Sequence, residues 1–171
     1  MIEREKTFLV KSLPKDLHTA PSKEIIDVYF PKTKVHPTLR LRKNGDRFEL
    51  TKKEPVTKGD ASVQKEQTII LTEEEFALFN TLEGKRVHKI RYAYPYKDTI
   101  AEFDVFQGPL KGLAVVDFEF ESEEEKERFI APDFCFVDIT QEDFIAGGML
   151  CGKRYEDIEE ELARFDYERL E

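Results

Sequence analysis

Residues 39–53 read LRLRKNGDRFELTKK, and this stretch decides the fold. From Leu39 to Arg42, apolar and basic residues alternate, which is the pattern of a β-strand with two chemically different faces. Asn44-Gly45 favours a tight hairpin turn, and a second alternating run follows from Phe48 to Lys53. The stretch therefore predicts two antiparallel strands that pair with each other.

The same alternation continues on both sides of this hairpin. It predicts further strands over residues 2–10, 63–71, 87–94, 100–106, 113–121 and 136–140, which makes about eight strands in total. Acidic residues after Thr72 and Ser122 mark the first turns of short helices over residues 73–79 and 123–129. Apolar residues at helical spacing predict a closing amphipathic helix, at Tyr155, Ile158, Leu162 and Phe165. Residues 17–39 carry no clear pattern, and the order of elements favours an antiparallel barrel or sheet with a few covering helices.

The composition limits the class of partner. The chain has 171 residues, of which 40% are hydrophobic and 37% charged, and its 36 acidic and 27 basic residues give a formal charge of −9. This excess of acid argues against a general nucleic-acid-binding surface. No apolar run reaches the roughly 18 residues of a membrane-spanning helix. The length fits one domain over residues 1–171, and 14 Phe and 6 Tyr are enough for its core.

The cysteines and histidines predict no chemistry of their own. Cys135 and Cys151 are too few for a disulfide framework, and the first thirty residues lack the apolar segment of a signal peptide. We therefore expect a reduced, cytoplasmic protein that binds neither nucleic acid nor a membrane, and we leave a homodimer open. His18, His36 and His88 lie outside the charged strands, so we assign them no catalytic role.

The charges are sorted by strand. Residues of one parity share a strand face, and like charges pair in this way at Glu3 with Glu5, Arg40 with Arg42, Lys89 with Arg91, Glu102 with Asp104, and Asp117 with Glu119. One interpretation is an amphipathic sheet whose charges pair across strands in solvent. The other is a barrel whose interior is charged, where charges are tolerated only when paired, hydrated or bound to ions. An interior with a basic and an acidic side suits a polyphosphate held by Arg and Lys, with divalent metals on the carboxylates.

The ordered motifs resemble those of the CYTH superfamily, which includes class IV adenylate cyclases, thiamine triphosphatases and inorganic triphosphatases built on a triphosphate tunnel. The similar segments are Glu3-Arg4-Glu5, Arg40-Leu41-Arg42, Leu50-Thr51-Lys52-Lys53, Lys89-Ile90-Arg91, Glu102-Phe103-Asp104, residues 108–113, Asp117-Phe118-Glu119 and Asp138-Ile139-Thr140. One departure is visible in the first motif, E-x-E-x-K, because Thr7 stands at the lysine position and Lys6 has the opposite parity.

The resemblance implies an α+β fold, namely an antiparallel eight-stranded β-barrel (the triphosphate tunnel) with a charged interior, covering helices and a C-terminal helix. It implies that the triphosphate contacts Arg40, Arg42, Lys53, Lys89 and Arg91, with Lys153 or Arg154 as an added basic residue from the C-terminal region. Mg²⁺ or Mn²⁺ would be held by Glu3, Glu5 and Glu119. Assistance in catalysis would come from Glu119, Asp117 and Asp138.

Three functions are compatible with these residues. The first is metal-dependent hydrolysis of a triphosphate, which would be inorganic tripolyphosphate, thiamine triphosphate or a nucleoside triphosphate. The second is a class IV-type adenylate cyclase that makes cyclic AMP from ATP. The third is a non-catalytic protein that binds polyphosphate or a phosphorylated metabolite, an interpretation favoured by Thr7 at the lysine position. We expect the hydrolase.

Overall fold

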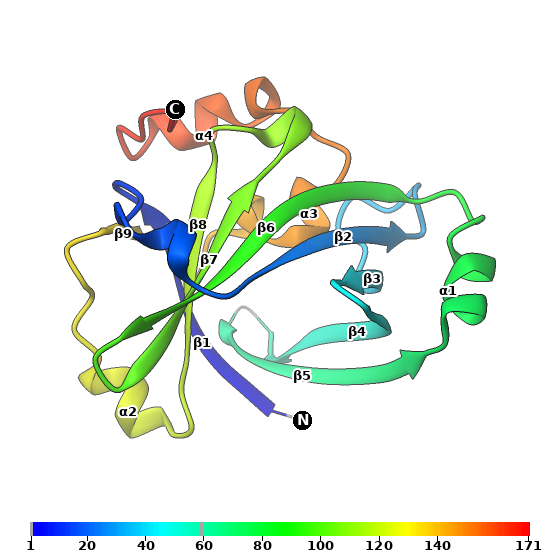
Figure 1. Cartoon of the computed structure of the whole chain (residues 1–171), viewed down its shortest axis with the longest axis horizontal. Helices are drawn as coiled ribbons and strands as arrows, with labels where there is room; N and C mark the ends of the chain where they lie inside the picture. The colour runs from blue at the N-terminus through cyan, green and yellow to red at the C-terminus, as the bar shows by residue number, and fades with distance from the viewer. Residues whose placement is uncertain (1, 59) are drawn as a thin grey trace.

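A single antiparallel sheet dominates the computed structural model, which describes residues 2–58 and 60–171 (Figure 1). Its nine strands are β1 (Ile2–Val10), β2 (Ser22–Phe30), β3 (Leu39–Asn44), β4 (Arg47–Thr57), β5 (Asp60–Leu71), β6 (Lys85–Tyr96), β7 (Thr99–Phe106), β8 (Ala114–Glu119) and β9 (Cys135–Asp138). The quoted hairpin is formed by β3 and β4, whose register pairs Asn44 with Arg47 around a Gly45 of positive φ. A positive φ is the conformation that glycine adopts most readily.

Eight of these strands close into a barrel. Their order is β5-β4-β3-β2-β6-β7-β8-β1, and β1 pairs back onto β5 from Ile2 with Lys65 to Arg4 with Val63. Further along the same strand, β1 pairs with β9, from Phe8 with Asp138 to Val10 with Cys135. The predicted eight-stranded antiparallel barrel is therefore confirmed, with β9 as an additional strand beside the ring.

One of the eight strands of the barrel was not predicted. β2 lies in the stretch that carries no clear pattern, and residues 136–140 were predicted as the eighth strand in its place. β2 was missed because both of its faces are buried: Val28 packs on one face, and Ile25 and Tyr29 on the other. A strand buried on both faces does not alternate between polar and apolar residues.

Short helices cover parts of the barrel. α1 (Glu73–Phe79) begins at a capping box made by Thr72 and Glu75, and α2 (Glu123–Arg128) begins at Ser122, as predicted. The predicted closing helix is divided into the 3₁₀ turn η4 (Tyr155–Asp157) and the short α4 (Glu159–Ala163), preceded by α3 (Gly147–Leu150). The remaining 3₁₀ turns are η1 (Leu17–Thr19), η2 (Gly108–Leu110) and η3 (Asp143–Ile145). Within the described ranges, no helix has the length and apolar character needed to cross a bilayer.

Aromatic residues cover the outer face of β1, β7 and β8. Phe103 and Phe118 are fully buried there, and their rings lie 5.0 Å from Phe134 and 4.5 Å from Phe129, respectively. Both ring partners come from the chain after β8. The expectation that the apolar strand faces point outward and are covered is confirmed on this side of the barrel.

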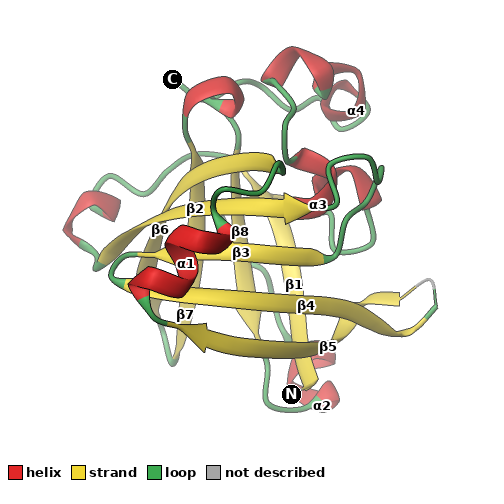
Figure 2. Cartoon of the chain, turned by 90° about the vertical axis from the view of Figure 1, so that its right-hand side faces the viewer, coloured by secondary structure: helices red, strands yellow, loops and turns green. Residues whose placement is uncertain are grey.

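A second apolar cluster closes one end of the barrel. Leu9, Val87, Phe106 and Val115 lie on the same strand faces as the charged residues, but they are buried among side chains of the C-terminal segment, including Phe144, Leu150, Ile158 and Leu162. We call these eight residues the apolar plug. Figures 1 and 2 show α3 and α4 gathered on this side of the barrel. The interior is therefore charged over only part of its length, which the strand pattern did not predict.

The two cysteines are free thiols, as expected. Cys151 is buried and Cys135 is half-buried. Burial raises the pKa of Cys135 to about 12 and that of Cys151 to about 11. Because the thiolate is the reactive form, neither thiol is suited to act as a nucleophile at neutral pH.

We predict that truncating a side chain of the apolar plug lowers the stability of the folded protein. Leu162 is 1% exposed, so Leu162→Ala should lower the free energy of unfolding by about 2–5 kcal/mol. Glu160→Ala, on the exposed side of the same helix, should change it by less than about 0.5 kcal/mol. Urea denaturation measures both, and equal effects would show that the C-terminal segment does not stabilise the barrel.

Candidate active site

The charges of six strands meet inside the barrel. The pairing register sets Glu5 opposite Glu119 and Thr7 opposite Asp117. It also sets Arg91 opposite Asp104. Two groups result: a basic wall on β3, β4 and β6 (Arg40, Arg42, Lys53, Lys89 and Arg91) and an acidic wall on β1, β7 and β8 (Glu3, Glu5, Glu102, Asp104, Asp117 and Glu119). The structure thus brings together nine of the eleven residues predicted for the site.

Arg42 is fixed by a buried carboxylate. Its Nε donates to Oδ1 of Asp27 at 2.7 Å, and its Nη2 donates to Oδ2 at 2.8 Å. The two side chains are 9% and 1% exposed. Burial opposes both charges, but their attraction outweighs it, raising the pKa of Arg42 and lowering that of Asp27. The guanidinium is therefore charged and held in one orientation.

Asp104 holds two further cations of the basic wall, Arg91 and Lys89. Arg91 donates to its two carboxylate oxygens, each at 2.7 Å, and also to Oε2 of Glu102 at 2.6 Å. Lys89 contacts the same Oδ2 of Asp104. Although burial opposes ionisation of Asp104, Arg91 and Lys89 hold its pKa far below the usual range. Burial lowers the pKa of Lys89, and the nearby Arg91 and Arg42 add to this effect.

Lys53 lies among the carboxylates of the acidic wall. Its Nζ is 2.8 Å from Oε2 of Glu3 and 3.1 Å from both carboxylate oxygens of Glu5. Burial raises the pKa of Glu5 despite this contact. Glu119 is exposed at the end of β8, yet partial desolvation and the neighbouring Glu102 raise its pKa as well. The carboxylates of Glu3, Glu5 and Glu119 together carry more negative charge than Lys53 alone can neutralise.

The donor set of the acidic wall fits a hard divalent cation. Mg²⁺ and Mn²⁺ prefer carboxylate oxygens, and Glu3, Glu5 and Glu119 come from adjacent strands. Across residues 2–58 and 60–171, no three acidic, His or Cys side chains form a ready-made metal site. Lys53 contacts both Glu3 and Glu5. The raised pKa values of Glu5 and Glu119 show that these carboxylates would be stabilised by additional positive charge.

Arg40 supplies a donor that fits an anion. Its Nε is buried and has no hydrogen-bond partner among the described residues. A buried donor without a partner is costly, and a ligand that accepts from it removes that cost. Arg40 lies on the same face of β3 as Arg42, so an anion in contact with one guanidinium lies near the other.

Thr7 occupies the interior position expected from the motif. Its Oγ1 donates to Oδ1 of Asp117 at 2.7 Å, and Oδ2 of Asp117 is 3.4 Å from Nη2 of Arg91. Lys6 points to the other face of β1 and lines an outer groove. The inference that a threonine, and not a lysine, faces the acidic wall is consistent with this geometry.

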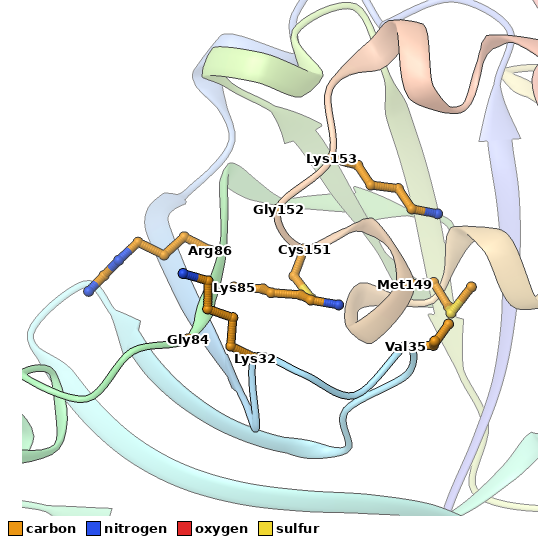
Figure 3. A pocket seen from close by; sticks show the side chains of 9 residues that line it. All are labelled: Lys32, Val35, Gly84, Lys85, Arg86, Met149, Cys151, Gly152 and Lys153. Atoms are coloured by element: carbon orange, nitrogen blue, oxygen red, sulfur yellow. The ribbon is translucent and has the colours of Figure 1, made fainter.

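Two predicted site residues are not brought to the interior. Asp138 pairs with the outward-facing Phe8, and its Oδ1 accepts from the backbone N–H and hydroxyl of Thr140 at 2.9 and 2.6 Å. Lys153 lines a separate groove at the end of the barrel that the apolar plug closes (Figure 3). Both residues follow the last strand of the ring, so the strand pattern did not fix their positions.

Three carboxylates of the interior were missed as site residues. Asp27 lies in the unpatterned stretch, and only the residues that flank it, which are rich in β-branched and aromatic types, could have indicated a strand. Glu102 and Asp104 belong to the sorted charges, but their roles as partners of Arg91 and Lys89 depend on the register between β6 and β7.

Known proteins are similar to this chain in sequence and in architecture. The sequence profile of the CYTH domain matches residues 1–133. An inorganic triphosphatase from Nitrosomonas europaea is 33% identical over 144 residues, which are 83% of this chain and 91% of that protein. A crystal structure of an inorganic triphosphatase superposes with a TM-score of 0.63 at 28% identity, covering 88% of this chain and 95% of the other.

A more distant structure shows the same fold. A candidate adenylate cyclase from Bacillus halodurans superposes with a TM-score of 0.53 at 16% identity, covering 99% of this chain and 92% of that chain. At this identity the likeness concerns the fold alone. The match of the family profile over most of the chain and the closed antiparallel barrel lead to one conclusion: the chain belongs to the CYTH domain family.

Proposed function

We propose that this protein hydrolyses a triphosphate inside the barrel with the help of a divalent metal, and that inorganic triphosphate is the substrate. The observation that carries the proposal is the meeting of the basic and acidic walls within one closed ring of strands. Arg40, whose Nε is buried and has no hydrogen-bond partner within the described part of the chain, supplies a donor for a phosphate oxygen. The relationship to an inorganic triphosphatase at 33% identity supports the same substrate.

The basic wall would bind and orient the phosphate chain. Arg40 and Arg42 would donate to phosphate oxygens from β3, and Lys89 and Arg91 from β6. Asp27 and Asp104 act as positioning residues, because they fix the guanidinium planes and so reduce the reorganisation that substrate binding requires. In phosphoryl transfer, such positioning and electrostatic stabilisation supply most of the rate acceleration.

The acidic wall would hold the metal and accept the proton of the attacking water. Glu3, Glu5 and Glu119 would hold Mg²⁺ or Mn²⁺, which neutralises phosphate charge and lowers the pKa of water when bound. Glu119 would accept the proton that the water loses as it attacks the terminal phosphorus, while the bond from that phosphorus to the bridging oxygen breaks and pyrophosphate leaves. Asp117 would assist, since it lies between Thr7 and Arg91.

A phosphate-release assay tests the reaction class. Protein treated with a chelator should release no phosphate from inorganic triphosphate, and adding Mg²⁺ or Mn²⁺ should restore release. Thiamine triphosphate and ATP are tested in parallel, with cyclic AMP measured for ATP. Cyclic AMP as the main product would identify a cyclase instead, and metal-dependent binding without turnover would identify a binding protein.

The proposed role of Glu119 predicts a change in the pH profile. Glu119→Gln should lower kcat by about 10²–10⁴-fold, since the amide cannot accept a proton. In the unaltered protein, activity should be lost as the pH falls and Glu119 becomes protonated. The variant should lack this acidic limb. Glu121→Gln, an exposed residue just beyond β8, is the matched control, and an equal loss there would contradict the assignment.

We predict that replacing Thr7 by lysine increases the affinity for inorganic triphosphate. Thr7→Lys should place an ammonium group beside the acidic wall, where it can contact a phosphate oxygen, and lower KM for inorganic triphosphate by about tenfold, as expected for one charged hydrogen bond. Ser12→Lys adds the same charge at an exposed position beyond β1 and should leave KM unchanged. If Thr7→Lys leaves KM unchanged, the phosphate chain does not reach this part of β1.

A further inference from the structure

A second groove lies outside the barrel, at the end closed by the apolar plug. Its volume is about 640 Å³. The start of β6 and the preceding Gly84 form one side, the connection from β2 to β3 forms another, and the chain after α3 forms the third (Figure 3). The lining residues are Lys32, Val35, Gly84, Lys85, Arg86, Met149, Cys151, Gly152 and Lys153.

The groove is basic although the protein is acidic. Four of its nine lining residues are Lys or Arg and none is acidic, whereas the whole chain carries a charge of −9. Lys32 is 3.7 Å from Glu83, and both side chains are more than half exposed, so this pair contributes little. Among the described residues, Lys85 and Arg86 donate to uncharged oxygens, at Lys34 and Asn80, and no ion pair involves Lys153. The positive charge is therefore available to an anion.

Apolar side chains separate this groove from the charged interior. Lys85, Val87 and Lys89 alternate on one face of β6, and Val87 belongs to the apolar plug. Lys85 and Lys89 are four residues apart, which is about 13 Å along a strand. Cys151, which lines the groove, is itself buried in the same apolar cluster. An anion in this groove would therefore not be the one bound by Arg42 and Arg91.

The apolar part of the groove indicates the kind of anion. Val35 is 75% exposed, and in Figure 3 it lies with Met149 on the side toward which the ammonium groups of Lys85 and Lys153 point. A single inorganic phosphate would fill little of this volume, whereas sites for small organic ligands range over roughly 300–1,000 Å³ and combine apolar surface with a few charged groups. We propose that the groove binds a nucleotide, with its phosphate held by Lys85 and Lys153 and its base against Val35 and Met149.

Titration calorimetry with AMP tests this proposal. AMP is titrated, with chelator present, into the unaltered chain and into Arg40→Ala, which removes a cation of the barrel interior that does not line the groove. Both proteins should bind AMP with the same affinity. The double variant Lys85→Glu/Lys153→Glu should weaken AMP binding by at least about tenfold, since charged contacts are lost. Lys11→Glu/Lys15→Glu, which changes the net charge equally at exposed positions, should bind as the unaltered protein does.

A second comparison separates a nucleotide from free phosphate. Val35→Ser should weaken AMP binding and leave the affinity for inorganic phosphate unchanged, with the same thermal unfolding as the unaltered protein. The proposal is overturned if Arg40→Ala weakens AMP binding as much as the Lys85 and Lys153 reversals do, if those reversals have no more effect than the control, or if inorganic phosphate binds as tightly as AMP. Because the readout is binding in the groove, it is independent of whether the barrel hydrolyses triphosphate.

Discussion

The contact of Asp104 with Arg91 and Lys89 is the interaction on which the arrangement of the interior depends. A carboxylate that is 1% exposed is stable as an anion only when cations surround it. β7 and β6 are neighbours in the ring, and their register sets Asp104 directly opposite Arg91. Asp27 and Arg42 repeat the arrangement between β2 and β3. Burial of charge thus requires the strands to pair in one register, and that register in turn aims the guanidinium groups at the interior.

The barrel meets a second constraint at its closed end. The strands that carry inward charges continue with inward apolar residues: Val115 precedes Asp117 on β8, and Leu9 follows Thr7 on β1. These side chains need an apolar partner inside the ring, and the C-terminal segment provides it through residues such as Ile158 and Leu162. The plug therefore stabilises the barrel by burying these apolar side chains. It also separates the cations inside the barrel from the cations of the groove beyond it.

Most of the barrel could be predicted from local alternation, and the rest depended on contacts between distant segments. The strands with sorted charges were recognised because one face is apolar and the other charged. β2 was missed because Ile25, Val28 and Tyr29 are buried on both of its faces. Of the site residues, those on the charged strands of the ring were placed by parity, whereas Asp138 lay on a predicted strand outside the ring and Lys153 was assigned by resemblance alone. Their positions follow from how the chain after β8 packs, which no local pattern specifies.

The balance of charge in the interior bears on how a polyanion could enter it. The carboxylates described there outnumber the cations, since Glu3, Glu5, Asp27, Glu102, Asp104, Asp117 and Glu119 face Arg40, Arg42, Lys53, Lys89 and Arg91. Arg42, Lys53, Lys89 and Arg91 are each already paired with a carboxylate. A triphosphate that entered alone would add repulsion to carboxylates whose pKa values are already raised. A divalent cation between the phosphate chain and the acidic wall removes this repulsion, so substrate and metal should bind cooperatively.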